Sequence, residues 1–378
     1  MMDLISVIWT NGLSFIIILS VIVFVHEMGH YLIARYNGVR VEVFSIGFGP
    51  EIFGWDDRAG TRWKIGLLPL GGYVKMFGDA NEASAPGGDL VEMTPEERAV
   101  SFHHKRLGQR TAVVFGGPLA NFLLAIVILS VMFATVGQRI TPAEISMIKP
   151  GSPAEAAGIM PGDTVLRIDG AAIERFEDLQ NIARESAGVP LAMVILRDGA
   201  EIELTVTPAL VEQTDRFGNI HRLGQIGVGR SGVTFVRHGP LYSIWAATVE
   251  TYSLTAMTLG ALGEMIVGVR TADELGGPIR IAQISGQVAE DGLVAVLWFT
   301  ALLSINLGLI NLFPIPMLDG GHLLFYAFEA IRGKPLGERA QEYGFRIGLA
   351  VVLSLFVFVT WNDFVRLEVV DLVVGLFS

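Results

Sequence analysis

The sequence predicts a polytopic α-helical membrane protein with about four transmembrane helices, a membrane-associated β-hairpin region and an inserted α/β domain. Three features predict this architecture: an apolar composition, several long hydrophobic segments, and a middle stretch of different character. Hydrophobic residues make up 51% of the 378 residues and charged residues only 17%. The mean hydropathy is +0.52. This composition indicates a polytopic membrane protein with some soluble mass attached.

Four segments approach the roughly 20 apolar residues that a spanning helix needs. We place them at about residues 12–34, 112–136, 293–313 and 347–361. The last segment is short, so tilt or flanking aromatic residues would have to complete it. A fifth stretch, 241–269, is apolar but contains Glu250 and Glu264, which favours an interfacial helix over a fifth span.

Basic residues are concentrated in two of the connections between these segments. Lys and Arg recur between the first and second spans and again between the third and fourth, whereas residues 1–13 contain none. The positive-inside rule places both connections in the cytoplasm. The middle region would then face the periplasm of a Gram-negative bacterium, and the chain would lie in its inner membrane.

The stretches between the spans carry signals for strands and turns. Residues 40–78 alternate in polarity and are punctuated by glycine, which predicts short strands and turns. Residues 80–90 are typical of a flexible loop. The middle region contains a Pro-Gly-Ser-Pro turn at 150–153 and a hairpin signal at Asp198-Gly199. We therefore expect an N-terminal membrane part, a soluble domain, an amphipathic connector and a C-terminal membrane part at 1–137, 138–230, 231–292 and 293–378.

The strongest chemical signal is His26-Glu27-Met28-Gly29-His30 in the first apolar segment. On a helix, histidines four residues apart lie on one face, one turn from each other. Both imidazoles can then bind one Zn²⁺, and the intervening Glu27 can accept a proton from water activated by the metal. Ionisable groups within a span need a partner or a function. The alternative is a structural polar cluster between helices.

Zinc needs a third protein ligand if one position stays open for water. Asp319 lies just after the third apolar segment, and two prolines between that segment and Asp319 interrupt the helix. His322 follows three residues later and is also a suitable ligand. Spacing alone does not separate the two residues, and a loop or N-cap carboxylate is the alternative for Asp319.

Several motifs resemble the site-2 protease family of intramembrane zinc metalloproteases, in particular its bacterial regulator-of-sigma-E branch. The motifs are HEMGHYLIARYNGVRVEVFSIGFGP, LPLGGYVKMFGD, GGPLANF, GGPIRIAQ and INLGLINLFPIPMLDGGHLLF. The middle segment GSPAEAAGIMPGDTVLRIDG resembles a bacterial PDZ domain. The resemblance covers nearly the whole chain.

This resemblance implies zinc ligation by His26, His30 and Asp319, with Glu27 as catalytic base. It also implies that Asn311 binds or orients the substrate backbone and that Asn121 contributes to substrate binding, with packing as an equal alternative. The family's re-entrant β-hairpin would correspond to residues 40–78. Some relatives carry two PDZ domains, whereas this chain shows one.

The implied activity is zinc-dependent cleavage of single-span membrane proteins in regulated intramembrane proteolysis. Substrates of the anti-sigma-factor kind and leftover signal peptides are expected, with the PDZ-like domain binding peptide or protein ends. The net charge of -11 disfavours a nucleic-acid partner. A chain without cysteine has no thiolate metal site and no disulfide. A membrane scaffold and an ion-pathway transporter are the competing classes, although no inverted repeat is visible.

Overall fold

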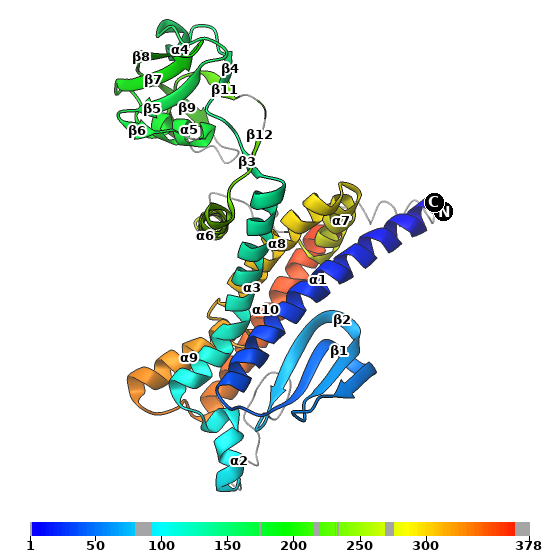
Figure 1. Cartoon of the computed structure of the whole chain (residues 1–378). Helices are drawn as coiled ribbons and strands as arrows, with labels where there is room; N and C mark the ends of the chain where they lie inside the picture. The colour runs from blue at the N-terminus through cyan, green and yellow to red at the C-terminus, as the bar shows by residue number, and fades with distance from the viewer. Residues whose placement is uncertain are drawn as a thin grey trace. The chain divides into compact units, whose positions relative to one another are not determined.

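The computed structural model describes residues 2–79, 93–173, 175–214, 220–230, 232, 234–268 and 276–366. The chain divides into two compact units (Figure 1), each described by itself below. The helical unit comprises Met1–Val131 and Ser243–Ser378, and the middle unit comprises Met132–Tyr242. The predicted flexible loop at 80–90 lies outside the described residues.

The helical unit contains all the long apolar helices of the described chain. Its elements are α1 (Met2–Tyr36), β1 (Val41–Asp56), β2 (Arg62–Met76), α2 (Pro95–Val100), the 3-10 turn η2 (Phe102–His104), most of α3 (Leu107–Thr135), most of α6 (Pro240–Ile266), α7 (Pro278–Glu290), α8 (Leu293–Asn311), α9 (Asp319–Arg332) and α10 (Glu338–Arg366). Four of these are long and apolar enough to cross a membrane: Thr10–Tyr36, Leu107–Thr135, Leu293–Asn311 and Arg339–Val365. The 27-residue α6 is not among them.

The fourth apolar helix is longer than the predicted segment 347–361. It begins with charged residues that lower the local hydropathy but do not oppose helix formation. Arg346 donates to Glu342 at 2.6 Å, one turn earlier on α10, and such pairs stabilise a helix. The helix extends beyond the predicted segment because apolar residues alone defined the ends of that segment.

Small residues bring the first two spanning helices into close contact. A Cβ atom on Gly29 of α1 would overlap the carbonyl oxygen of Gly116 on α3 and lie 2.8 Å from the Ala120 Cβ. Apolar side chains on both sides of this crossing, including Ala34 and Val113, are fully buried. The crossing fixes the face of α1 that α3 covers, and this face carries His26 and His30.

The amino end of α7 is held by a buried carboxylate from the last helix. Asp363 of α10 is 2% exposed. Its two oxygens accept hydrogen bonds from the backbone N–H groups of Gly277 at 2.9 Å, Ile279 at 3.0 Å and Arg280 at 3.1 Å. A carboxylate at this position satisfies amides that the helix leaves free. α10 is thereby tied to α7, which in turn packs along α1.

Residues 41–76 form two long strands rather than the short strands that the sequence predicts. Both strands bend, so Phe44 of β1 has two partners across the sheet, Trp63 and Val74 of β2. Trp63 also pairs with Trp55, and their rings stack with centroids 5.9 Å apart. The sequence indicated separate strands because glycines mark the bends. Among the described residues, the segment Gly72–Met76 pairs on one side only and forms an edge of the sheet.

The middle unit is a small α/β domain with its own core. Its elements are the end of α3, β3 (Gln138–Ile140), β4 (Ile145–Ile148), α4 (Pro153–Ala156), β5 (Thr164–Ile168), β6 (Ala171–Ala172), α5 (Phe176–Glu185), β7 (Leu191–Arg197), β8 (Ala200–Val206), β9 (Ala209–Thr214), β10 (Ile220–Gln225), β11 (Val228–Arg230) and β12 (Thr234–Val236). A four-stranded sheet has the order β6-β5-β7-β8, and β4 pairs with β11.

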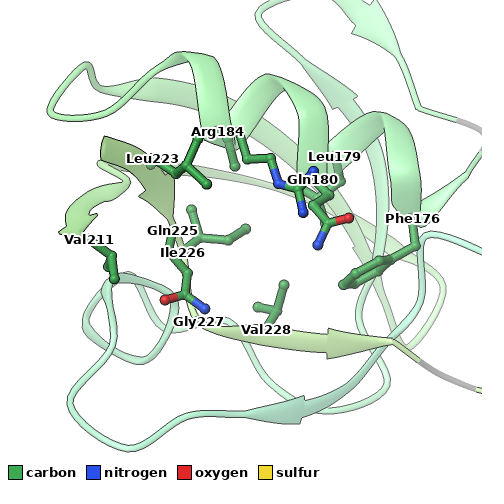
Figure 2. A pocket seen from close by; sticks show the side chains of 12 residues that line it. Phe176, Leu179, Gln180, Arg184, Val211, Leu223, Gln225, Ile226, Gly227 and Val228 are labelled. Carbon is green, nitrogen blue, oxygen red and sulfur yellow. The ribbon is translucent and has the colours of Figure 1, made fainter. Parts of the chain in front are cut away.

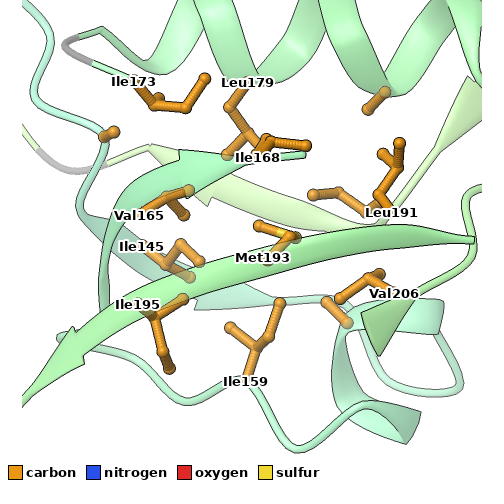
Figure 3. Packing of buried hydrophobic residues seen from close by; sticks show 14 of the residues in the cluster. Ile145, Ile159, Val165, Ile168, Ile173, Leu179, Leu191, Met193, Ile195 and Val206 are labelled. Carbon is orange, nitrogen blue, oxygen red and sulfur yellow. The ribbon is translucent and has the colours of Figure 1, made fainter. Parts of the chain in front are cut away.

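Strand alternation and one helix face build that core (Figure 3). Leu191, Met193 and Ile195 of β7 are buried, whereas the residues between them are more exposed. Leu179 of α5 lies beside Ile168 of β5 in Figure 3, and both are almost fully buried. The domain therefore buries an apolar interior without using the spanning helices.

Candidate metal centre

His26 and His30 present their ring nitrogens to one point inside the helical unit. The two Nε2 atoms are 3.2 Å apart, and the residues are 7% and 8% exposed. The Nδ1 of His30 lies 2.9 Å from the carbonyl oxygen of Val113 on α3. Since a carbonyl only accepts, Nδ1 carries the proton and the Nε2 lone pair is free to bind a metal.

A proline-interrupted loop carries Asp319 to the same point. α8 ends at Asn311, and Asp319 is the first residue of α9. Between them Met317 has a φ of 90°, which is unfavourable for a non-glycine residue. The Oδ2 atom of Asp319 lies 3.2 Å from the Nε2 of His26 and 3.4 Å from that of His30. A strained residue two positions before a carboxylate with a buried oxygen is typical of a functional site.

These three side chains fit a divalent metal by the chemistry of their donor atoms. One nitrogen from each histidine and one carboxylate oxygen lie within 4.8 Å of one another. The buried Oδ2 of Asp319 has no hydrogen-bond partner among the described residues, although two imidazole nitrogens point at it. Two histidines and one carboxylate are a common ligand set for catalytic zinc, with a fourth position for water.

A glycine on α3 leaves the space beside the two imidazoles open. A Cβ atom on Gly117 would overlap the Nε2 of His30 and lie 2.8 Å from the Cε1 of His26. Gly117 was not among the residues predicted to belong to the site. The sequence offers one indication, a glycine four residues before Asn121 in the second span. The role of this glycine depends on how α3 crosses α1, which the sequence does not show.

The ligand atoms open into a cavity of about 550 Å³ within the helical unit. Glu27 lines this cavity and is 8% exposed. The edge strand passes directly beside it, because a Cβ atom on Gly72 would lie 2.9 Å from the Glu27 Cγ. A buried acid, three candidate metal ligands and an open strand edge therefore share one cavity.

His322, the alternative third ligand, also lines the cavity. Its ring packs against Phe345 and Tyr326, with centroids 5.5 and 6.5 Å away. Within the described chain, the group of ligand atoms that meet contains Asp319 and not His322.

The model of peptidase family M50 matches residues 14–355. The chain belongs to this family of site-2 proteases. A Rhizobium meliloti (strain 1021) protein provisionally named a zinc metalloprotease is 46% identical over 355 residues, 93% of this chain and 95% of that protein. The metalloprotease MmpA of Caulobacter vibrioides is 39% identical over 389 residues, 97% of this chain and 98% of MmpA. Together with the four apolar helices, these matches identify a multi-pass membrane zinc metalloprotease.

Among solved structures, the PDZ domain of an SdrC-like protein from Listeria innocua covers 24% of this M50 peptidase and 94% of its own chain. The identity is 16% and the TM-score 0.20. The PDZ domain of the Listeria monocytogenes SdrC-like protein covers 24% and 87%, with 15% identity and a TM-score of 0.19. Matches at this level carry no argument about the middle unit.

Two asparagines take different places in the M50 peptidase. Asn311, the last residue of α8, is partly exposed and lines the cavity. Asn121 on α3 is fully buried, and its Nδ2 lies 3.2 Å from the Nδ1 of His26. Asn311 is therefore open to the cavity, whereas Asn121 lies behind His26, a candidate metal ligand.

The middle unit of the peptidase contains a groove of about 450 Å³ between α5 and the segment 223–228 (Figure 2). Phe176, Leu179 and Ile226 contribute apolar surface. Arg184 is the one charged side chain among the described residues that line the groove, and it has no ion-pair partner in the described part of the chain. The groove is therefore mostly apolar, with the amides of Gln180 and Gln225 and a single positive charge among its lining groups.

Proposed function

We propose that this M50 peptidase hydrolyses peptide bonds of membrane-spanning segments, with zinc held by His26, His30 and Asp319. One observation carries the proposal: three ligand atoms within 4.8 Å of one another open into the same cavity as Glu27. Both histidines belong to a helix that is long and apolar enough to cross a membrane. This placement favours cleavage at membrane depth over cleavage of soluble substrates.

Zinc, when bound, polarises a carbonyl group and makes water acidic. The role of the chain is to hold the metal and to move the proton. Glu27 follows His26 in α1 and lines the cavity. We assign it as the general base that takes the proton of the attacking water and delivers it to the leaving amine.

A helical substrate must be unwound locally, because its amides are otherwise engaged in helical hydrogen bonds. The edge Gly72–Met76 supports a way to hold the unwound segment. Among the described residues, Gly72 to Lys75 of this edge pair with β1 alone, whereas Met76 is also hydrogen-bonded to Asp79. Gly71 to Val74 line the cavity. We propose that the substrate pairs with this edge as an added strand, while Asn311 binds its backbone near the metal.

We further propose single-span membrane proteins as substrates, including proteins of the anti-sigma-factor kind and leftover signal peptides in regulated intramembrane proteolysis. The resemblance of the sequence motifs supports this class. The distribution of Lys and Arg supports an inner-membrane topology with the middle unit in the periplasm and the metal nearer the cytoplasm.

The middle unit is proposed to bind the end of a peptide or protein as a PDZ-like domain. Its apolar groove supports this role. β11 pairs with β4 and lies beside α5 across the groove. An extended peptide would add to β11 and place side chains in the groove.

The decisive experiment is cleavage of a single-span reporter by full-length enzyme in lipid vesicles. Glu27→Gln is expected to retain about one zinc per chain while losing roughly 100-fold or more of its rate, because general-base catalysis contributes about that much. Glu290→Gln, an exposed acid on α7, is the matched control and should cleave normally. Cleavage by Glu27→Gln at the wild-type rate would refute the mechanism.

The same variant tests the substrate class in cells. Membranes from cells carrying Glu27→Gln should accumulate single-span fragments that the wild type removes. If only soluble proteins accumulate, the proposed substrate class is wrong even though the metal site is correct.

A further inference from the structure

We infer that Asn121 is a positioning residue that fixes the ring and tautomer of His26 for zinc, instead of a residue that binds substrate. This inference rests on the proposed assignment of His26 as a metal ligand. The two histidines have equivalent hydrogen-bond partners on α3. The Nδ1 of His30 faces the Val113 carbonyl oxygen at 2.9 Å, and the Nδ1 of His26 faces the Asn121 amide at 3.2 Å.

The spacing on the two helices explains this equivalence. His26 and His30 are four residues apart on α1, and Val113, Gly117 and Asn121 follow at intervals of four on α3. Residues at this interval lie on one face of a helix. One face of α3 therefore contacts the Nδ1 of His30, makes room for both imidazoles at Gly117 and contacts the Nδ1 of His26, in that order along the helix.

The buried amide oxygen of Asn121 gives the functional reason. Oδ1 has no hydrogen-bond partner among the described residues, and Asn121 is 0% exposed. Rotation of the Asn121 side-chain amide by half a turn about its terminal C–C bond exchanges the positions of Nδ2 and Oδ1. Oδ1 then accepts a hydrogen bond from the Nδ1–H of His26, and the Nε2 lone pair becomes free for zinc. Metal-ligating histidines generally donate their second N–H to such an acceptor.

The surroundings hold Asn121 in this position. Ser304 of α8 donates to the Asn121 backbone oxygen at 2.8 Å. The Cβ of Asn121 faces Gly308, where an added Cβ would lie only 3.2 Å away. α8 therefore covers Asn121 from the side away from His26. A side chain enclosed in this way contacts a metal ligand and has no exposed surface to offer a substrate.

The test measures zinc affinity of purified full-length protein by competition with a chromophoric chelator. Asn121→Leu removes the acceptor at similar volume and should weaken zinc binding by roughly 10–100-fold. Asn121→Asp restores an acceptor oxygen and should recover most of the affinity. Asn311→Leu is the matched control, because it changes an asparagine that lines the cavity, and it should impair cleavage without changing zinc affinity.

Cobalt substitution gives a readout that packing alone would not move. The visible spectrum of the Co²⁺ form should change in Asn121→Leu and return towards wild type in Asn121→Asp. If Asn121→Leu binds zinc as wild type does while His26→Ala loses zinc, the positioning role is refuted and the ligand assignment survives. If His26→Ala keeps wild-type affinity, the ligand assignment itself fails. Equal loss in the Leu and Asp variants would indicate packing and also refute the inference.

Discussion

Gly117 is the residue at which the smallest change should do most harm to the metal site. An added methyl group would overlap the Nε2 of His30 and contact the ring of His26. Neither ring can retreat easily, because each is hydrogen-bonded to α3 through Nδ1. Gly117→Ala is therefore expected to displace a ligand and lower zinc affinity by roughly 10-fold or more.

Chelator competition on the purified variant measures this change. Gly108→Ala is the control, since it adds the same methyl group to the same helix at a position with nothing within 4 Å. It should leave zinc affinity unchanged. A Gly117→Ala protein that binds zinc as tightly as Gly108→Ala would show that the cavity beside the imidazoles is not required.

For individual residues, the sequence predicted the candidate metal ligands but not the groups on α3 that hydrogen-bond to them. The i, i+4 spacing of His26 and His30 was sufficient to expect two imidazoles on one face. The choice between Asp319 and His322 remained open from the residues alone, because it depends on the turn that the Met317 backbone makes. The Val113 carbonyl could not be predicted, since a backbone oxygen has no sequence signature.

The bond between Asp363 and the start of α7 is the clearest contact between distant elements. Asp363→Asn keeps the shape of the side chain but removes its charge and one acceptor oxygen. Three backbone amides depend on that carboxylate, and hydrogen bonds to a charged group each stabilise a fold by about 1.5–3 kcal/mol. We expect faster hydrogen exchange at residues 277–280 and a lower melting temperature in detergent.

Asp291→Asn is a suitable comparison, because Asp291 is exposed at the other end of α7. Asp291→Asn should change neither the hydrogen exchange at the start of α7 nor the melting temperature. Wild-type exchange at 277–280 in Asp363→Asn would mean that packing of α7 against α1 holds the helix without the carboxylate.

Arg184 on α5 should set the charge preference of the groove in the middle unit. The remaining lining residues are uncharged, so an acidic peptide side chain would find its only opposite charge there. Arg184→Glu should weaken binding of an acidic extended peptide and strengthen binding of a basic one, each by roughly 1 kcal/mol for an exposed pair. Fluorescence anisotropy with the two labelled peptides measures this exchange of preference.

Arg167→Glu is the control for the overall charge, because Arg167 is paired with Glu201 outside the groove. At this distance from the groove the change is screened, so Arg167→Glu should shift the preference between the two peptides much less than Arg184→Glu does. If the two variants shift the preference by the same amount, the charge preference does not come from the groove.

Element boundaries were the least predictable feature of the helical unit. α10 extends through Arg339 and Arg346, beyond the apolar residues 347–361 of the predicted segment, because charged residues at the start of a helix do not oppose helix formation. The strands at 41–76 were expected to be short because glycines interrupt the alternation. Gly47, with a φ of 87°, instead lies within a continuous bent strand.

The middle unit and the helical unit have separate apolar interiors, which determine how the whole chain should unfold. The core of the middle unit consists of residues from 143–226, while the core around Phe44 and Val113 belongs to the helical unit. Composition predicted the spanning helices directly. The middle core was visible only as alternation within single strands, since its partners are far apart in sequence. Each interior is expected to have its own stability and its own pH dependence.

Asp163 should make the middle unit sensitive to acid. Burial opposes ionisation of its carboxyl group, but hydrogen bonds from Arg197, at 2.7 and 2.8 Å, and from the Met160 amide hold its pKa below the ordinary value. A depressed pKa means that the folded state favours the ionised form. The resulting stabilisation is present above pH about 4, the ordinary range of an aspartate, and is lost as the pH falls through the lowered pKa.

Asp163→Asn should therefore lower the free energy of unfolding of the middle unit by about 1.5–3 kcal/mol at neutral pH. The difference from wild type should shrink as the pH falls below about 4, because the wild-type carboxyl group then also loses its charge. Urea titration of the full-length protein, with pulsed deuterium labelling of β5 and β7, reports the unfolding of this unit separately from that of the helical one.

Asp198→Asn is the control, since Asp198 is exposed in a hairpin with a φ of 51° that asparagine tolerates equally. A difference of the same size at neutral and acid pH would show that Asp163 stabilises the unit through shape, and that its charge contributes nothing.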